Sequence, residues 1–119
     1  MPSELTFYVP TKLISEANQR EHWAIKTKRK KAQQRAVELY WLSQRFRVAP
    51  PVVVTLTRVG VRKLDPDNLA GSFKHVQDAI AKCMGVDDGD ERKVRWIYEQ
   101  RKGLPKEYGL EVRIVEVDR

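Results

Sequence analysis

A stretch from Glu21 to about Gln44 contains neither glycine nor proline, and it limits the possible folds more than any other part of the sequence. Ala, Lys, Arg, Gln and Leu dominate this stretch, and because these residues favour helices, the sequence predicts one long helix. Apolar residues spaced three and four apart in its C-terminal half mark the face that should meet the core. That predicted stripe consists of Ala32, Ala36, Leu39 and Tyr40.

Four other segments have the pattern of strands, which is residue-by-residue alternation or a high content of Val and Thr. Prolines at 10, 50 and 51 interrupt the chain between these segments and the long helix. Residues 102–109 contain two Gly and one Pro and predict a hairpin loop between the last two strands. The predicted strands are residues 5–9, 52–61, 94–99 and 110–114.

A second helix is predicted from Asp65 to Gly85. Asp65-Pro66-Asp67-Asn68 is a typical helix start, and Gly85 is a typical stop signal. Between them, Leu69, Phe73, Val76 and Ile80 form an apolar stripe. The predicted order is β-α-β-α-β-β, which indicates a single α+β domain over residues 1–119, with a mixed β-sheet covered by two helices.

The bulk composition fits such a domain in a reducing compartment. Hydrophobic residues make up 41% of the chain, which argues against disorder although 33% of residues are charged. No apolar stretch approaches the roughly 20 residues that a membrane span needs. Cys83 is the single cysteine and cannot form an internal disulfide, so we expect a cytoplasmic protein with no membrane partner.

The charge balance favours a nucleic acid partner. Lys and Arg number 23 against 16 Asp and Glu, for a net charge of +7 and a pI near 9.7. Basic residues gather at the start of the long helix with no acid among them except Glu21, a pattern suited to a row of phosphates. A solvated helix face is the alternative. His22 and Trp23 nearby suit either base stacking or, for Trp23, core packing. The candidate DNA-binding residues are Arg20, Lys26, Lys28, Arg29, Lys31 and Arg35.

Acidic residues cluster at two places in this basic chain, at Asp65 and Asp67 and again at Asp87, Asp88 and Asp90. Carboxylates beside a phosphodiester would repel it unless a cation lay between them, and Mg²⁺ prefers such oxygen ligands. The pattern therefore suits metal-dependent phosphoryl chemistry. Helix capping and an ordinary surface turn explain the same residues without a metal.

The combination of these motifs resembles the RusA family of Holliday junction resolvases. The resemblance rests on the segment from Leu64 to Leu69, on Phe73-Lys74 followed by Asp78-Ala79-Ile80, and on Gly85-Val86-Asp87-Asp88. It implies a homodimeric endonuclease that uses Mg²⁺, or Mn²⁺ in its place, to resolve four-way DNA junctions by paired symmetric nicks. It also implies that Asp65, Asp67 and Asp88 bind the metal and that Lys74 is the active-site lysine.

This sequence departs from the family pattern at two positions. Pro66 stands between the paired acids, where it suits the first helical position. Lys74 follows Asp67 by seven residues, three more than the spacing in the family, so a solvated surface lysine is the alternative for Lys74. Two other functions remain open for the whole chain. These are a non-catalytic DNA-binding phage or prophage module on the same scaffold and an RNA- or ribosome-associated basic protein.

Overall fold

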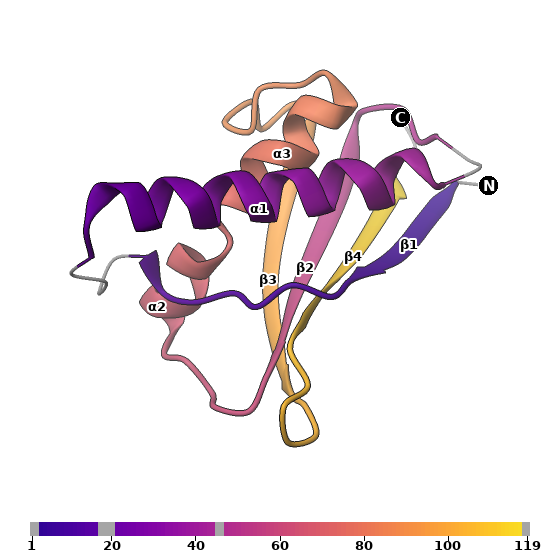
Figure 1. Ribbon diagram of the computed structural model, residues 1–119. Helices are drawn as coiled ribbons and strands as arrows, with labels where there is room; N and C mark the ends of the chain where they lie inside the picture. The colour runs from indigo at the N-terminus through magenta and orange to yellow at the C-terminus, as the bar shows by residue number, and fades with distance from the viewer. Residues whose placement is uncertain (1–2, 17–20, 45–46, 118–119) are drawn as a thin grey trace.

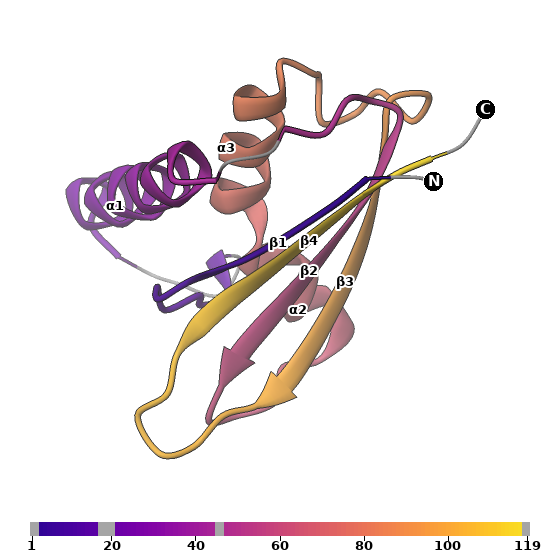
Figure 2. The same ribbon diagram turned by 90° about the vertical axis from the view of Figure 1, so that its right-hand side faces the viewer.

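The chain forms a four-stranded mixed sheet with three helices packed on one of its faces (Figures 1 and 2). The computed structural model describes residues 3–16, 21–44 and 47–117. The α+β class, the single domain body and the mixed sheet predicted from the sequence are confirmed for these residues. The elements are β1 (Glu4–Val9), α1 (Trp23–Leu42), β2 (Val52–Gly60), α2 (Pro66–Ser72), α3 (Lys74–Met84), β3 (Val94–Lys102) and β4 (Gly109–Glu116).

The strand order in the sheet is β1-β4-β2-β3. β2 pairs in parallel with β3, and the connection between them contains α2 and α3, as a parallel pair requires a long crossover. β4 runs antiparallel to both β1 and β2. The hairpin predicted at residues 102–109 is wrong, because β2 lies between β3 and β4 and the loop passes the end of β2, where the Gly103 N–H bonds the Gly60 carbonyl at 2.8 Å.

The core lies between the sheet and the helices. Every second residue of β1 and β4 points into it, as the alternation of the sequence predicts. In β2, Val52, Val54 and Leu56 are buried in the same way. The predicted stripe of the second helical region also faces the core, with Phe73, Val76 and Ile80 fully buried and Leu69 nearly so. Cys83 and Met84 pack against this core from the end of α3.

The stripe predicted for α1 is wrong except at Ala36, which is partly buried and packs against the core. The residues that α1 buries are Gln33, Val37 and Trp41, one position away from the predicted set, and Leu39 is 57% exposed. Gln33 enters the core because its side-chain amide donates to the Lys12 carbonyl at 3.2 Å. The helix therefore contacts the sheet through a narrow stripe, and apolar residues remain on its outer face. Within the described ranges, no helix has the length and apolarity to cross a membrane.

The segment predicted as one helix is divided into α2 and α3 at Phe73. Gly71 and Ser72 both favour such a break, since glycine is a weak helix former and the Ser72 hydroxyl donates back to the Leu69 carbonyl at 2.6 Å. α3 ends as predicted at Gly85, which adopts a left-handed conformation with φ of 72°. The break turns the N-terminal half of the segment, with Asp65 and Asp67, away from the axis of α3.

Candidate functional site

Asp65 caps the first turn of α2. One of its carboxylate oxygens accepts the Asn68 backbone N–H at 2.8 Å, and the other accepts the Asn68 side-chain amide at 2.9 Å. Pro66 occupies the first helical position. The Ser15 hydroxyl donates to the Asn68 carbonyl oxygen at 2.6 Å, which ties this turn to the loop after β1. The capping role considered for Asp65 is therefore confirmed, and both of its oxygens already accept a hydrogen bond.

Asp67 lies in the first turn of α2 and is exposed. The positive end of the helix dipole favours a carboxylate at this position. Among the described residues it forms no hydrogen bond or ion pair, so its carboxylate is open to a ligand or to water.

Asp88 pairs with a carboxylate that the sequence analysis did not assign, that of Asp78 on α3. Asp78 is exposed overall, but partial burial raises the pKa of its carboxyl, and the charge and the hydrogen bond of Asp88 raise it further. His75 and Lys30 act in the opposite direction and lower the pKa of Asp78. Two carboxyl groups at hydrogen-bonding distance repel each other when both are ionised, so they share a proton or attract a cation. Gly85 makes this pairing possible because it ends α3 and lets the chain turn back along the helix.

A small network holds Asp88 against β3. The Trp96 indole N–H donates to the Asp88 backbone carbonyl at 2.9 Å, and the Gln77 amide donates to the Asp88 carboxylate at 3.5 Å. The Tyr98 hydroxyl donates to the Gln77 carbonyl oxygen, and its ring stacks on Phe73 with 5.2 Å between centroids. Burial raises the pKa of Tyr98, and the Asp88 charge raises it further.

The acids at the two ends of α2–α3 are connected through Tyr98. Tyr98 and Asp65 line the same surface hollow, which also includes Leu69 and Gln100. Tyr98 contacts Gln77, and Gln77 contacts Asp88. However, the part of the chain that the structure describes contains no group of three Asp, Glu, His or Cys side chains placed to hold one metal ion. The structure thus does not bring Asp65, Asp67 and Asp88 together as one such group.

The chemistry of the Asp78–Asp88 pair nevertheless fits Mg²⁺. A divalent cation between the two carboxyls would remove the repulsion that raises the pKa of Asp78. Mg²⁺ is commonly bound by one or two carboxylates, with waters and a substrate phosphate filling its other positions. The pair supplies those carboxylates.

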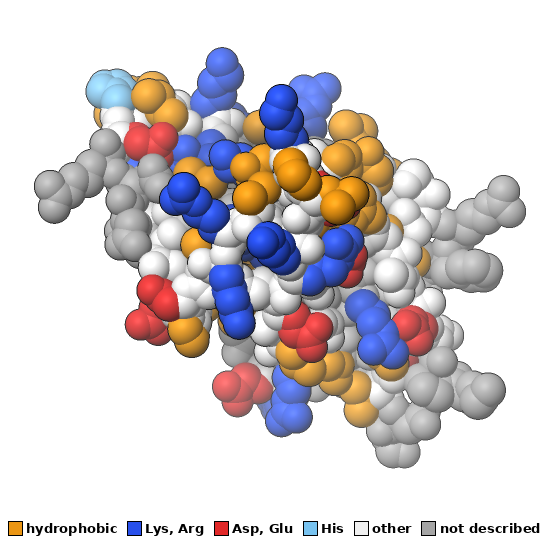
Figure 3. Space-filling view, turned by 90° about the horizontal axis from the view of Figure 1, so that it is seen from below, with side chains coloured by type: hydrophobic (Ala, Val, Ile, Leu, Met, Phe, Trp, Pro, Cys, Tyr) orange, Lys and Arg blue, Asp and Glu red, His pale blue; other side chains and the backbone are white. Residues whose placement is uncertain are grey.

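The basic residues predicted to bind DNA lie in three different settings. Lys28, Lys31 and Arg35 are exposed on the outer face of α1. Lys26 is half-buried and faces α3. Lys and Arg side chains are spread over the face seen in Figure 3, with hydrophobic side chains between them. Arg20 lies outside the described residues.

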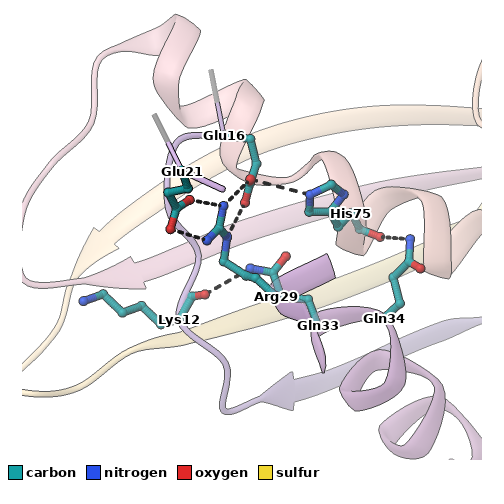
Figure 4. Close-up of polar contacts among 7 residues, drawn as sticks. All are labelled: Lys12, Glu16, Glu21, Arg29, Gln33, Gln34 and His75. Atoms are coloured by element: carbon teal, nitrogen blue, oxygen red, sulfur yellow. Dashed lines mark hydrogen bonds and ion pairs between the residues drawn. The ribbon is translucent and has the colours of Figure 1, made fainter. Parts of the chain in front are cut away.

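Arg29 is engaged by two carboxylates and is mostly buried. Its guanidinium donates to both oxygens of Glu16, at 2.8 and 2.7 Å, and to Glu21 at 3.1 Å (Figure 4). These partners raise the pKa of Arg29, and Arg29 in turn lowers the pKa of Glu16. Only 16% of the Arg29 side chain is exposed. Its place in the structure is thus an internal ion-pair cluster that joins α1 to the loop after β1.

Lys74 lies beside α1 in a hollow of about 190 Å³, which we call the α1–α3 hollow. Among the described residues, Lys74 forms no ion pair or hydrogen bond. The hollow places it with two lysines of α1 at the N-terminal end of α3. The residues that line the hollow are Glu16, Lys26, Thr27, Lys30, Lys74 and His75.

Trp23 is not a core residue, since it is 72% exposed at the first position of α1. The ring of His22 lies beside it with 5.5 Å between centroids, and His22 caps the helix by accepting the Ala24 N–H at 3.2 Å. The core-packing alternative for Trp23 is therefore wrong. Stacking on a base stays a prediction.

No family model and no curated protein sequence matches this chain. The RusA resemblance therefore stays a prediction that rests on the motifs themselves. Asp78, Gln77 and Tyr98 are the site residues that sequence reasoning missed. One signal pointed to Asp78, which is part of the quoted motif and lies ten residues before Asp88 on the far side of a helix stop.

Proposed function

We propose that this chain is a Mg²⁺-dependent endodeoxyribonuclease that cuts branched DNA, with the four-way junction as substrate. The observation that carries the proposal is the Asp78–Asp88 carboxyl pair of a strongly basic protein, in which the charge of Lys30 acts on Asp78. A carboxylate pair suits a divalent cation, and the neighbouring ammonium groups suit the phosphates of a DNA strand. Mn²⁺ has similar ligand preferences and is expected to replace Mg²⁺.

The residues of the chain then have separate roles. Lys28, Lys31 and Arg35 bind backbone phosphates along the outer face of α1. Asp88 and Asp78 hold the cation, and Mg²⁺ when bound polarises a phosphoryl oxygen of the substrate. Asp67, which has no partner among the described residues, completes the site once DNA is bound, as the resemblance implies.

The reaction is hydrolysis of a phosphodiester. Water adds to phosphorus, the bond from phosphorus to the 3′ oxygen breaks, and the 3′ oxygen takes a proton. The products carry 5′-phosphate and 3′-hydroxyl ends. Because one junction needs two symmetric nicks and one chain offers one site, we propose that the active species is a homodimer with two-fold symmetry. The single cysteine, Cys83, favours a cytoplasmic setting.

A non-catalytic DNA-binding module is the second candidate, and one observation favours it. Both oxygens of Asp65 are occupied by Asn68, and no three acids of the described residues form a group that could hold a metal ion. In that function, Asp65 and Asp67 only cap and stabilise α2, and α1 alone binds DNA.

Incubation with a labelled four-way junction, with and without Mg²⁺, separates the two candidates. We expect paired nicks in the parent protein only when Mg²⁺ is present. Asp67→Asn and Asp88→Asn should bind the junction like the parent and cut at least about a hundredfold more slowly, a loss of about 2.7 kcal/mol in transition-state stabilisation. A parent protein that binds the junction and never cuts it in Mg²⁺ or Mn²⁺ would establish the binding module instead. An Asp67→Asn protein that cuts as fast as the parent would remove Asp67 from the site.

A further inference from the structure

We propose that the α1–α3 hollow binds one phosphate group of a nucleic acid backbone through Lys26, Lys30 and Lys74. This inference rests on the proposed function, and it names the place where the strand enters the site. Lys26 and Lys30 are one helical turn apart on the same side of α1, and Lys74 faces them from the first turn of α3.

The three ammonium groups are available for an anion. Among the described residues, none of the three lysines forms an ion pair or a hydrogen bond. Of the residues that the structure describes, Glu16 is the only acid that lines the hollow, and the guanidinium of Arg29 occupies both of its carboxylate oxygens (Figure 4). Arg29 therefore offsets part of the Glu16 charge, and the three lysines outnumber the one acid.

His75 lies between the acid and the lysines of the hollow. Burial lowers the pKa of its imidazole. The charge of Glu16, at 3.6 Å, raises this pKa, and the charges of Lys30 and Lys74 lower it. Its Nδ1 atom is buried and has no hydrogen-bond partner in the part of the chain that is described. The N-terminus of α3 adds positive potential at the hollow, because its N-cap residue, Phe73, provides no side-chain cap for the first-turn N–H groups.

The position of the hollow favours a strand over a free anion. Lys30 acts both on His75 in the hollow and on Asp78 of the carboxyl pair, so the hollow and the pair are neighbours. Exposed cations continue from the hollow over the outer face of α1, where Lys28 and Lys31 lie. A polyanion can contact both sets of charges at once, whereas a single free phosphate can contact only one.

The test uses sulfate, which stays doubly charged across the pH range of the experiment and imitates a phosphate group. The NMR signals of the His75 imidazole, assigned by comparison with His75→Gln, are followed during a sulfate titration at constant ionic strength set with chloride. No Mg²⁺ is added. We expect a saturable change in the parent protein, and at least about tenfold weaker binding in Lys26→Gln/Lys30→Gln, since charged hydrogen bonds are lost.

The matched control is Lys82→Gln/Lys102→Gln, which removes the same two charges from exposed positions outside the hollow. It should bind sulfate within about twofold of the parent. Equal weakening in both double variants would show a general charge effect and overturn the proposal, and so would a linear response without saturation in the parent. Lys74→Gln, on the other helix, must weaken sulfate binding as well, and an unchanged affinity there would also overturn it.

A short DNA duplex then identifies the source of the phosphate. If the hollow binds a backbone phosphate, the duplex displaces sulfate and changes the same His75 signals. If sulfate binds and the duplex neither displaces it nor changes those signals, the hollow takes small phosphorylated anions and the nucleic acid proposal is wrong. Because nothing is cut in these experiments, a protein that never cleaves a junction can still pass them. If the protein cuts junctions but its His75 signals change with neither sulfate nor the duplex, this inference is wrong and the proposed nuclease function stands.

Discussion

Replacing Asp78 by Asn distinguishes two effects of the carboxyl pair. One is the loss of folding stability caused by repulsion between the carboxylates, and the other is the binding of a divalent cation. The pair is unfavourable in the absence of metal, because the pKa of Asp78 lies above its ordinary value of 3.8 in the folded protein. The folded chain then binds a proton more readily than the unfolded chain, so stability falls as the pH rises from 3.8 through the folded-state pKa. The full cost is present above the folded-state pKa, and it disappears below pH 3.8.

The expected increase in the free energy of unfolding from Asp78→Asn is small, because Asp78 is exposed and solvent screens its charge. Repulsive side-chain pairs at such positions cost about 0.5 kcal/mol. For a domain of this size, this corresponds to an increase of about 2 °C in the melting temperature. We also expect the amide of Asn to donate a hydrogen bond to the Asp88 carboxylate, in place of the repulsion between two carboxylates.

Magnesium should reverse the order of stability of the parent protein and Asp78→Asn. At a metal concentration of about ten times the dissociation constant, a ligand that binds only the folded state stabilises it by about 1.4 kcal/mol. The parent protein gains this amount, and Asp78→Asn gains much less because half of the pair is gone. The variant is therefore the more stable protein without Mg²⁺, and the parent is the more stable one with it.

Urea unfolding at pH 7 and pH 3.5, with and without Mg²⁺, measures these differences. Glu38→Gln removes an equal charge from an exposed position of α1 and serves as the control. We expect Mg²⁺ to stabilise this control and the parent protein equally. Two results would refute the reasoning. One is an Asp78→Asn protein that is less stable than the parent at pH 7 without metal. The other is equal stabilisation of parent and Asp78→Asn by Mg²⁺.

Two further predictions concern the residues that hold the site in place. Asp65→Ala removes the cap of α2 and should lower the free energy of unfolding by about 1 kcal/mol in urea titrations. Asp65→Asn should lower it by less than half as much, because the amide oxygen can still accept the Asn68 N–H. Equal losses in the two variants would show that Asp65 does not stabilise α2 as its cap. Arg29→Met leaves Glu16 and Glu21 without their partner and should cost about 3 kcal/mol. The pKa of Glu16 is lowered by Arg29, so this pair stabilises the fold above pH 4.5 and the contribution is lost as the pH falls through the folded-state pKa. Stability measured from pH 6 to pH 3 should therefore fall more steeply in the parent than in Arg29→Met, and parallel curves would contradict the assignment.

Local signals in the sequence predicted local structure well. The alternation in β1 and β4 placed the correct residues in the core, and Asp65-Pro66 and Gly85 marked a helix start and a helix end. These features depend on contacts within a few residues, where side-chain type and backbone geometry are closely coupled.

The errors concern structure that depends on distant partners. The loop at 102–109 resembles a hairpin, but the place of β2 between its flanking strands is decided by pairing across the whole sheet. The stripe of α1 was displaced because Gln33 is polar, and only its bond to Lys12 makes it a core residue. The pairing of Asp78 with Asp88 likewise depends on how the chain turns back after Gly85, which spacing along the sequence does not determine.

The strand order also determines when the sheet can be completed as the chain leaves the ribosome. Among the described strands, β1 pairs only with β4. β1 therefore has no pairing partner until β4, with Val115 opposite Glu4, has been synthesised. β2 and β3 can pair earlier, around the crossover that contains Asp78 and Asp88. The half of the sheet that supports the acidic residues can therefore assemble first, and the strand synthesised last is inserted between two strands made long before it.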